Sequence, residues 1–127
     1  MAYTTIDDPS AYFQNVLWTG DGSAGNAVTF DGNSDMQPDF VWSKRRDVGY
    51  GHVLKDTSRG GTSNNDVHLV SNTTAGDSTY TAYRMDFNSD GFTLDGSGDS
   101  GFQANGTSMV SWSWKANGGT TSTNTDG

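Results

Sequence analysis

Hydrophobic and polar residues alternate most strictly between Met109 and Ala116, in the sequence MVSWSWKA. The even positions are apolar, and the odd positions after Met109 are serine or lysine. Alternation of this kind directs successive side chains to opposite faces of an extended chain, and so predicts a half-buried β-strand. A helix would place Trp112 and Trp114 about 200° apart around its axis. We therefore expect both tryptophans on one face of a strand, with much of the hydrophobic core around them.

Apolar runs separated by turn-forming residues predict seven further short strands. They span Tyr12–Trp18, Ala27–Phe30, Asp39–Lys44, His52–Asp56, Val67–Ser71, Tyr80–Phe87 and Phe92–Leu94. The last two are joined by Asn88-Ser89-Asp90-Gly91, a hairpin turn with glycine where a positive φ is needed. Eight short strands joined by turns favour an all-β fold, an antiparallel β-sandwich of the jelly-roll type.

Composition strengthens the all-β prediction. Gly, Ser, Thr, Asn and Asp make up 73 of the 127 residues, and all fifteen acidic residues are aspartate. These residues favour turns and compete with helix formation. The length fits one domain, which we place at residues 1–117. Residues 118–127 have the Gly/Thr/Ser/Asn-rich composition of a linker or tail.

Charge and hydropathy narrow the range of partners. The net charge of −8 argues against nucleic acid, whose phosphates require a basic surface. No window approaches the ~20 apolar residues of a membrane span, so we expect no membrane insertion. The chain has no cysteine for a disulfide or a thiolate metal site. Its first residues lack the pattern of a signal peptide, so we expect synthesis and assembly inside a cell.

One motif suggests calcium. Asp86, Asn88, Asp90 and Gly91 match the first half of an EF-hand loop, in which alternate oxygens surround the ion. The twelfth position is Ser97 instead of a bidentate glutamate, and strands are expected on both sides. We favour an Asx-rich hairpin turn. A weak calcium site on the loop aspartates is the alternative.

Other candidate catalytic and metal-ligating residues favour structural roles. His52 and His68 each lie in a strand-like run with no second ligand at metal spacing. Gly98-Asp99-Ser100-Gly101 is similar to the nucleophile segment of chymotrypsin-like proteases, but such tetrapeptides arise easily in this composition, and we reject that role. We assign no catalytic, cofactor-binding or metal residues.

Charged and aromatic residues offer weaker hypotheses. The only basic cluster, Lys44-Arg45-Arg46, is interpreted as a solvated strand end, with an anion or interface contact as the alternative. Asp56 and Arg59 are expected within pairing reach across a tight turn. Trp18, Trp42 and the tyrosines could stack on sugar rings, although most aromatic residues are expected in the core of so lean a domain.

Several stretches together resemble a family of marine phage structural proteins, described as tail fibre or virion proteins. They are MAYTTIDDPSAYFQ, GNSDMQPDFVWSKRR, DTSRG, SDGFTL and VSWSWKANGGTTSTNTDG. The resemblance implies a sandwich similar to concanavalin-like, laminin-G or SPRY-like domains, commonly followed by further domains after the Gly-Gly linker. It implies no catalytic residue. Ser43 stands where members carry an aliphatic residue, so we expect a more exposed face at that point.

We therefore predict a non-enzymatic structural module in the tail or on the surface of a phage virion, which assembles with copies of itself and other virion proteins. Strand edges and aromatic faces would make the contacts, and acidic loops would face outward. The competing hypothesis is a carbohydrate-binding module that recognises host surface glycans. An Asp-based hydrolase is disfavoured, because no apolar pocket that would raise a carboxyl pKa can be identified.

Overall fold

The structure is a computed structural model that describes residues 7–59, 67–96 and 101–116. Its regular elements are short strands with two 3-10 turns, η1 and η2, and no longer helix in the described ranges. In chain order they are η1 (Pro9–Ala11), β1 (Phe13–Thr19), β2 (Asn26–Val28), β3 (Phe40–Arg45), β4 (Val53–Asp56), β5 (Val67–Val70), β6 (Ser78–Thr79), η2 (Thr81–Tyr83), β7 (Met85–Asn88), β8 (Gly91–Leu94) and β9 (Ser108–Trp114). The prediction of an all-β fold is confirmed.

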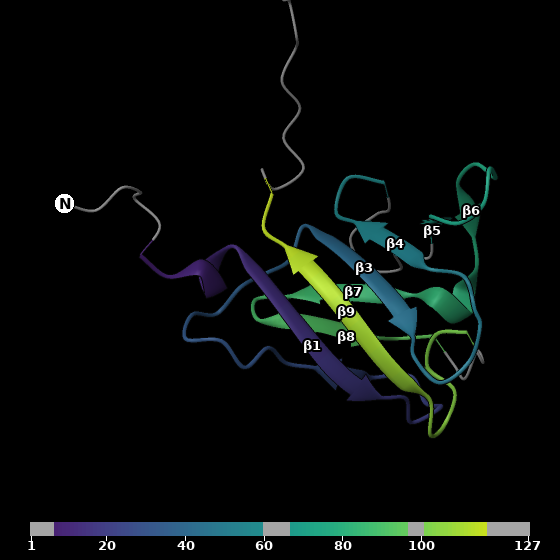
Figure 1. Ribbon diagram of the computed structural model, residues 1–127, viewed down its shortest axis with the longest axis horizontal. Coiled ribbons are helices and arrows are strands. Elements are labelled where there is room, and N and C mark those ends of the chain that lie inside the picture. The colour runs from purple at the N-terminus through teal and green to yellow at the C-terminus, as the bar shows by residue number, and fades with distance from the viewer. Residues whose placement is uncertain (1–6, 60–66, 97–100, 117–127) are drawn as a thin grey trace, which may run out of the picture.

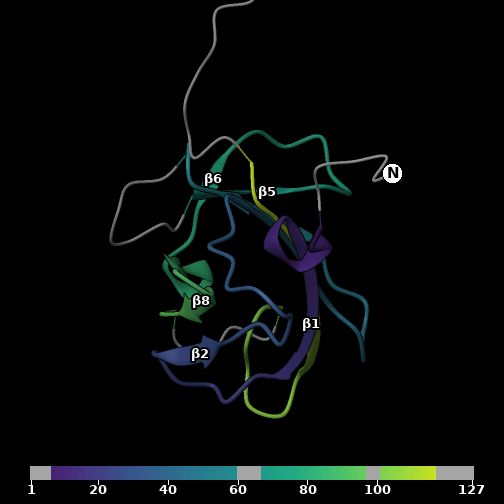
Figure 2. The same cartoon turned by 90° about the vertical axis from the view of Figure 1, so that its left-hand side faces the viewer.

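The strands form two antiparallel sheets. The larger has the order β1-β9-β3-β4-β5-β6, and the smaller has the order β2-β8-β7. In Figure 1 the large sheet lies in front of β7 and β8, and Figure 2 shows β1 and the small sheet on opposite sides of the molecule. The fold is therefore a β-sandwich with layers of unequal size, in which β9 lies between β1 and β3.

Register in the large sheet aligns the aromatic residues of three strands. Trp114 is opposite Phe13 on one side and Phe40 on the other, and Trp112 is opposite Trp42. Residues directly opposite in antiparallel strands share a face of the sheet, so these aromatic side chains all point the same way.

The core lies between the sheets, and the small sheet and the loops supply most of its large side chains. The buried hydrophobic residues are Val28, Phe30, Met36, Val41, Val53, Met85, Phe92, Leu94, Phe102 and Met109. Of these, only three come from the large sheet: Val41, Val53 and Met109. Trp18, from β1, packs against this core with its ring centroid 5.5 Å from that of Phe92.

The prediction that Trp112 and Trp114 form the centre of the core is wrong. Burial along β9 alternates in the opposite sense, because Met109, Ser111 and Ser113 are 0% exposed and the two tryptophans are partly exposed. Met109, on the same face of β9 as the two serines, belongs to one buried cluster with Phe92 of the small sheet and Phe102 of the loop before β9. A sheet that meets bulky residues needs small ones at the facing positions, so the serines are inside.

Ser43 also corrects an expectation. It is 1% exposed, so its face of β3 is buried and not more open. Its hydroxyl donates to the carbonyl oxygen of Val53 at 3.4 Å. The serines of β3 and β9 thus lie on the inner face of the large sheet, next to Val41 and Met109.

Most predicted strands are present, with ends displaced by one or two residues. The range Tyr80–Phe87 is the exception, because η2 occupies its first half and only β7 remains as strand, while the short β6 precedes it. The hairpin between β7 and β8 is confirmed. Gly91 has φ of 98°, and a Cβ at this position would lie only 2.1 Å from the carbonyl oxygen of Val28. Glycine is therefore required by both backbone conformation and space.

Candidate functional site

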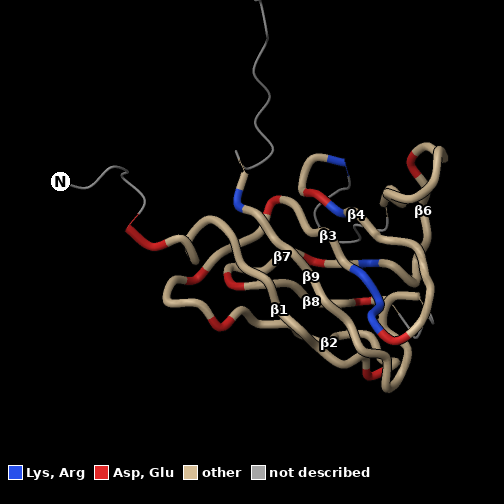
Figure 3. The backbone as a smooth tube through the Cα atoms, in the orientation of Figure 1, with Lys and Arg blue, Asp and Glu red and all other residues tan. Residues whose placement is uncertain are grey.

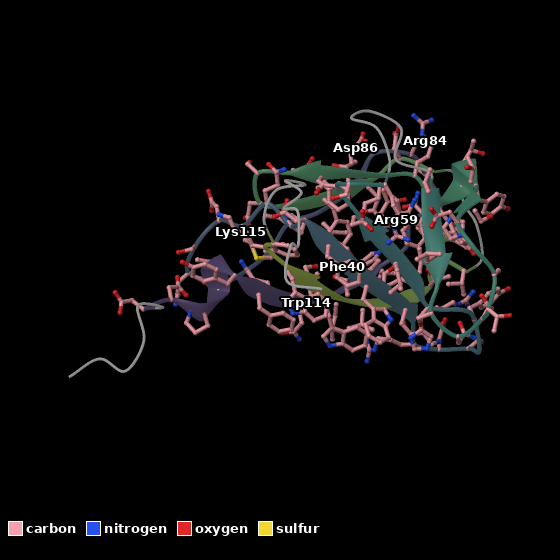
Figure 4. All side chains as sticks on the ribbon, turned by 90° about the horizontal axis from the view of Figure 1, so that it is seen from above. Phe40, Arg59, Arg84, Asp86, Trp114 and Lys115 are labelled. Carbon is pink, nitrogen blue, oxygen red and sulfur yellow. The ribbon has the colours of Figure 1, made fainter. Side chains whose placement is uncertain are left out.

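The large sheet carries aromatic side chains on the face that points away from the core. We call this the outer aromatic face and define it by its ring-bearing residues, which are Phe13, Phe40, Trp42, His52, Trp112 and Trp114. In Figure 4, Trp114 lies on the opposite side of the molecule from Arg84 and Asp86 of the small-sheet side. Phe13 is 38% exposed and Leu17, on the same face of β1, is 58% exposed. Large apolar side chains are thus exposed on β1 and partly exposed on the neighbouring β9 and β3.

One row of this face is a stack of three rings. Trp114 lies between Phe13, at a centroid distance of 5.1 Å, and Phe40, at 5.4 Å. Asp39 holds the end of β9 in place, because its carboxylate accepts from the backbone N–H of Ala116 at 2.9 Å and its own N–H donates to the Trp114 carbonyl. Asp39 is 8% exposed. This buried carboxylate is a positioning residue for Trp114.

The second row forms a groove. Trp42, His52, Trp112 and Trp114 line an open hollow with a volume of about 270 Å³. Trp42 meets Trp112 edge-on at a centroid distance of 6.1 Å and lies 5.8 Å from the His52 ring. The hollow is thus walled by rings from β3, β9 and the residue that precedes β4.

His52 is fixed in the groove by three hydrogen bonds. Its Nδ1 accepts from the indole Nε1–H of Trp42 at 3.0 Å. Its backbone N–H donates to the side-chain oxygen of Asn72, and its carbonyl accepts from the N–H of Ser71. Because Nδ1 accepts, the neutral imidazole carries its proton on Nε2. His52 therefore forms a fixed edge of the groove. The indole N–H of Trp42 is used within the groove itself and is not open to a ligand.

The Asp86–Asp90 segment forms the hairpin turn that the sequence favoured. Asn88 donates from its side-chain amide to the hydroxyl of Thr93 at 2.8 Å, and Asp90 accepts from the backbone N–H of Met36 at 3.3 Å. Within the described ranges, no three acidic or histidine side chains gather in a way that would hold a metal ion. Two of the motif's polar groups thus hold the turn, and the calcium alternative stays a hypothesis.

The basic cluster lies at the end of β3, where Figure 3 shows Lys and Arg gathered next to an acidic residue. Arg45 Nε contacts Asp47 Oδ1 at 2.5 Å, and the Arg45 guanidinium lies 5.4 Å from the centroid of the Tyr50 ring. The hydrogen bond that Arg45 donates to Asp47 lowers the pKa of the Asp47 carboxyl to about 2. Lys44 donates to the carbonyls of Arg45 and Val48. These contacts favour a structural role at the strand end.

The remaining sequence candidates are dispersed. Arg59 forms an ion pair with Asp56, as predicted from their spacing. His68 is 4% exposed, on the inner face of β5, and its ring is 4.9 Å from that of Tyr83. Most of the Gly98–Gly101 segment lies outside the described residues, as do residues 118–127 of the expected linker.

In the part of the chain that the structure describes, no helix is long and apolar enough to cross a bilayer.

Sequence reasoning did not bring Trp42, His52, Trp112 and Trp114 together. One signal was present: Trp42 and Trp112 are each followed by serine, and each alternates with small or aliphatic residues on the other face of its strand. If these two strands are neighbours and the two tryptophans are paired in register, both indoles lie on one face of the sheet. Pairing of β3 with β9 was the missing information, and it depends on the whole topology.

Comparison with known families gives one match. The chain belongs to the family described as a domain of unknown function, DUF7483, whose profile matches residues 8–127. No curated protein and no solved structure matches the chain.

Proposed function

We propose that this domain is a non-enzymatic structural module that works by assembly, with the outer aromatic face as a surface that becomes covered. A single observation carries the proposal: the outer face of β9 bears Val110, Trp112 and Trp114, whereas its inner face bears Met109 and two serines. A strand normally turns its more apolar face to the core. Here that face is turned toward solvent, which is the arrangement expected of a sheet that is covered by a partner.

The chemistry of the face supports contact with protein. Aromatic residues are enriched and charged residues depleted at the centres of protein interfaces. Across β1, β9 and β3, the two central rows of the outer face consist of rings and Asn15. Charged residues lie next to these rows: Asp56 is opposite Phe40 on β4, and Lys44 is in the next row, opposite Val110. Copies with a net charge of −8 repel one another, so an uncharged surface is where they can meet.

The sequence resemblance supplies the biological setting of the proposal. The stretches that resemble marine phage structural proteins include β3 and most of β9, the strands that carry Trp42, Trp112 and Trp114. We therefore place the module in a virion, as a tail-fibre or surface component assembled in the host cytoplasm, with copies of itself and other virion proteins as partners. Its acidic loops would face outward, toward the host surface.

The test is the mass of the purified chain in solution by light scattering, with and without EDTA. We expect an assembly of two or more copies that EDTA leaves intact, and Trp112→Ala should weaken it about tenfold or more, as loss of an interface tryptophan typically does. Thr93→Ala, a partly exposed change on the small sheet, is the control and should leave the mass unchanged. A monomer under all conditions would contradict assembly between copies. Dissociation by EDTA would instead revive the calcium hypothesis for Asp86–Asp90.

Carbohydrate binding is the second candidate, and the groove is the observation that favours it. Its volume of about 270 Å³ and its four rings suit the apolar face of a sugar. The Trp42 indole already donates to His52, which leaves few polar groups to select hydroxyls. Calorimetric titration with simple hexoses separates the candidates, because binding that is lost in Trp112→Ala while the mass stays monomeric would favour the glycan hypothesis.

A further inference from the structure

The free edge of β1 is the second unusual surface of the molecule. β1 ends the large sheet, and Figure 2 views the molecule from that side. Its seven residues, FQNVLWT, include no charge, proline or glycine. Natural edge strands normally carry such residues, or are very short, because open backbone groups pair with other chains. The opposite edge of the same sheet, β6, has only two residues. The long edge alone lacks protection.

The direction of the open hydrogen-bonding groups follows from the ladder with β9. The backbone N–H of Lys115 donates to the carbonyl of Tyr12, and that of Gly20 donates to the carbonyl of Thr107. The even-numbered residues of β1 therefore form the hydrogen-bonded pairs with β9. The odd-numbered residues Phe13, Asn15 and Leu17 therefore direct their N–H and C=O groups away from the sheet. Among the described residues, none forms a hydrogen bond with these backbone groups.

The same three residues project their side chains onto the outer aromatic face, since side chain and backbone direction alternate together along a strand. Phe13 and Leu17 are the most exposed large apolar residues of β1, at 38% and 58%. Phe13 also stacks on Trp114, at a centroid distance of 5.1 Å. The open edge is thus continuous with the surface proposed to be covered on assembly.

We infer that a second copy of this chain occupies the edge, with β1 pairing antiparallel to β1 across a two-fold axis at Asn15. This inference rests on the proposed function and specifies its contact. In this register Phe13 of each copy lies opposite Leu17 of the other on the outer face, and the two Asn15 residues meet. Pairing one residue further along would place Phe13 opposite Thr19 and Asn15 opposite Leu17. Apolar pairs stabilise a sheet better than such mixed ones, which selects the axis at Asn15.

Because the edge of β1 is uncharged and complementary to itself, it favours pairing with β1 of a second copy over pairing with a strand of another protein. The row Phe40–Trp114–Phe13 would continue through Leu17 of the second copy, joining both large sheets into one. No like charges meet along β1, although the chain as a whole carries −8.

A single cysteine tests the register, because the chain has none of its own. Two Asn15→Cys residues at the axis would lie about 5.5 Å apart between Cα atoms, within the range that a disulfide spans. We expect rapid cross-linking of the full chain by oxidised glutathione. Leu17→Cys is the matched control. It lies opposite Phe13 and not opposite itself, so it should cross-link at least about tenfold more slowly.

A charge variant tests the same contact without oxidation. Asn15→Lys would bring two ammonium groups together at the axis and should raise the dissociation constant about tenfold or more. Ala27→Lys adds the same charge at an exposed position of β2 and should leave the mass unchanged. Circular dichroism confirms that each variant is folded.

The outcomes separate the two proposals. If the wild-type chain assembles but neither Asn15 variant behaves as expected, the edge inference is overturned and assembly through the aromatic face stands. If the wild-type chain is a monomer at every concentration, both proposals are overturned.

Discussion

The two faces of the large sheet differ in a way that reverses the usual pattern. The inner face of β3 and β9 carries Val41 and Met109 with three serines, all almost fully buried. The outer face of the same strands carries phenylalanine and tryptophan, partly open to solvent. The small sheet fills the interior with its own bulky residues, so the large sheet needs little apolar volume on that side.

This comparison shows that apolar content and burial are separate properties of a strand. A monomer is stabilised by the inner face, which excludes water between the layers. The outer face adds little to folding of a single copy but has what an interface needs, namely large rings and little charge. Variants on the two faces should therefore change different measured quantities.

The largest expected effect is on the inner face. Met109→Ala removes a side chain that is 0% exposed and should lower the free energy of unfolding by about 2–5 kcal/mol. Val110 is the next residue of β9 and lies on the outer face, so Val110→Ala should lower the free energy of unfolding by about 1 kcal/mol or less. Urea denaturation of the two variants measures both values. Equal losses would mean that the outer face is as well packed within one copy as the core.

A gain in stability is expected at the inner serines. Within the described residues, nothing forms a hydrogen bond with the buried hydroxyls of Ser111 and Ser113. An unpaired buried hydroxyl costs about 1–3 kcal/mol, so Ser111→Ala or Ser113→Ala should raise the free energy of unfolding by about 1 kcal/mol. Ser43→Ala is the matched control, because its hydroxyl donates to Val53, and it should be neutral or slightly destabilising. A loss at Ser111 equal to that at Ser43 would show that its hydroxyl has a partner.

The smallest effect is expected at the end of β3, where Asp47 meets Arg45. The lowered pKa of Asp47, about 2 against an ordinary 3.8, means that its carboxylate stabilises the folded chain above pH 3.8. That contribution is lost as the pH falls through about 2. Asp47→Asn should lower the thermal midpoint slightly at neutral pH, and the difference from wild type should vanish in acid. Asp31→Asn, a change of the same charge in an exposed loop, is the control and should leave the thermal midpoint at neutral pH unchanged.

How far the sequence predicts this molecule depends on the range of the interactions involved. The β9 strand and the Gly91 hairpin follow from alternation and turn chemistry, which are local. Which face of β9 is buried depends on residues of the small sheet, such as Val28 and Met85, which are far from β9 in the sequence. Alternation shows that a strand has two different faces but not which of them is buried. The large aromatic residues of β9 suggested that their face was buried, and it is the outer one.

The candidate site was less accessible for the same reason. Trp42 was recognised as an aromatic residue able to stack on a ligand, but its partners Trp112 and His52 are fixed by strand pairing. The ion pair of Asp56 with Arg59 could be predicted, because three residues of a tight turn determine it. The open edge of β1 required the topology, since no local pattern says that a strand is the last of its sheet.

The placement of the tryptophans also determines what intrinsic fluorescence can report. Three of the four indoles, those of Trp42, Trp112 and Trp114, lie on the outer face, and only Trp18 packs against the core. The emission spectrum is therefore dominated by residues that sense solvent at the sheet surface. A blue shift with rising protein concentration would follow association, while the smaller signal from Trp18 would follow unfolding, so one optical probe observes the two processes through different residues.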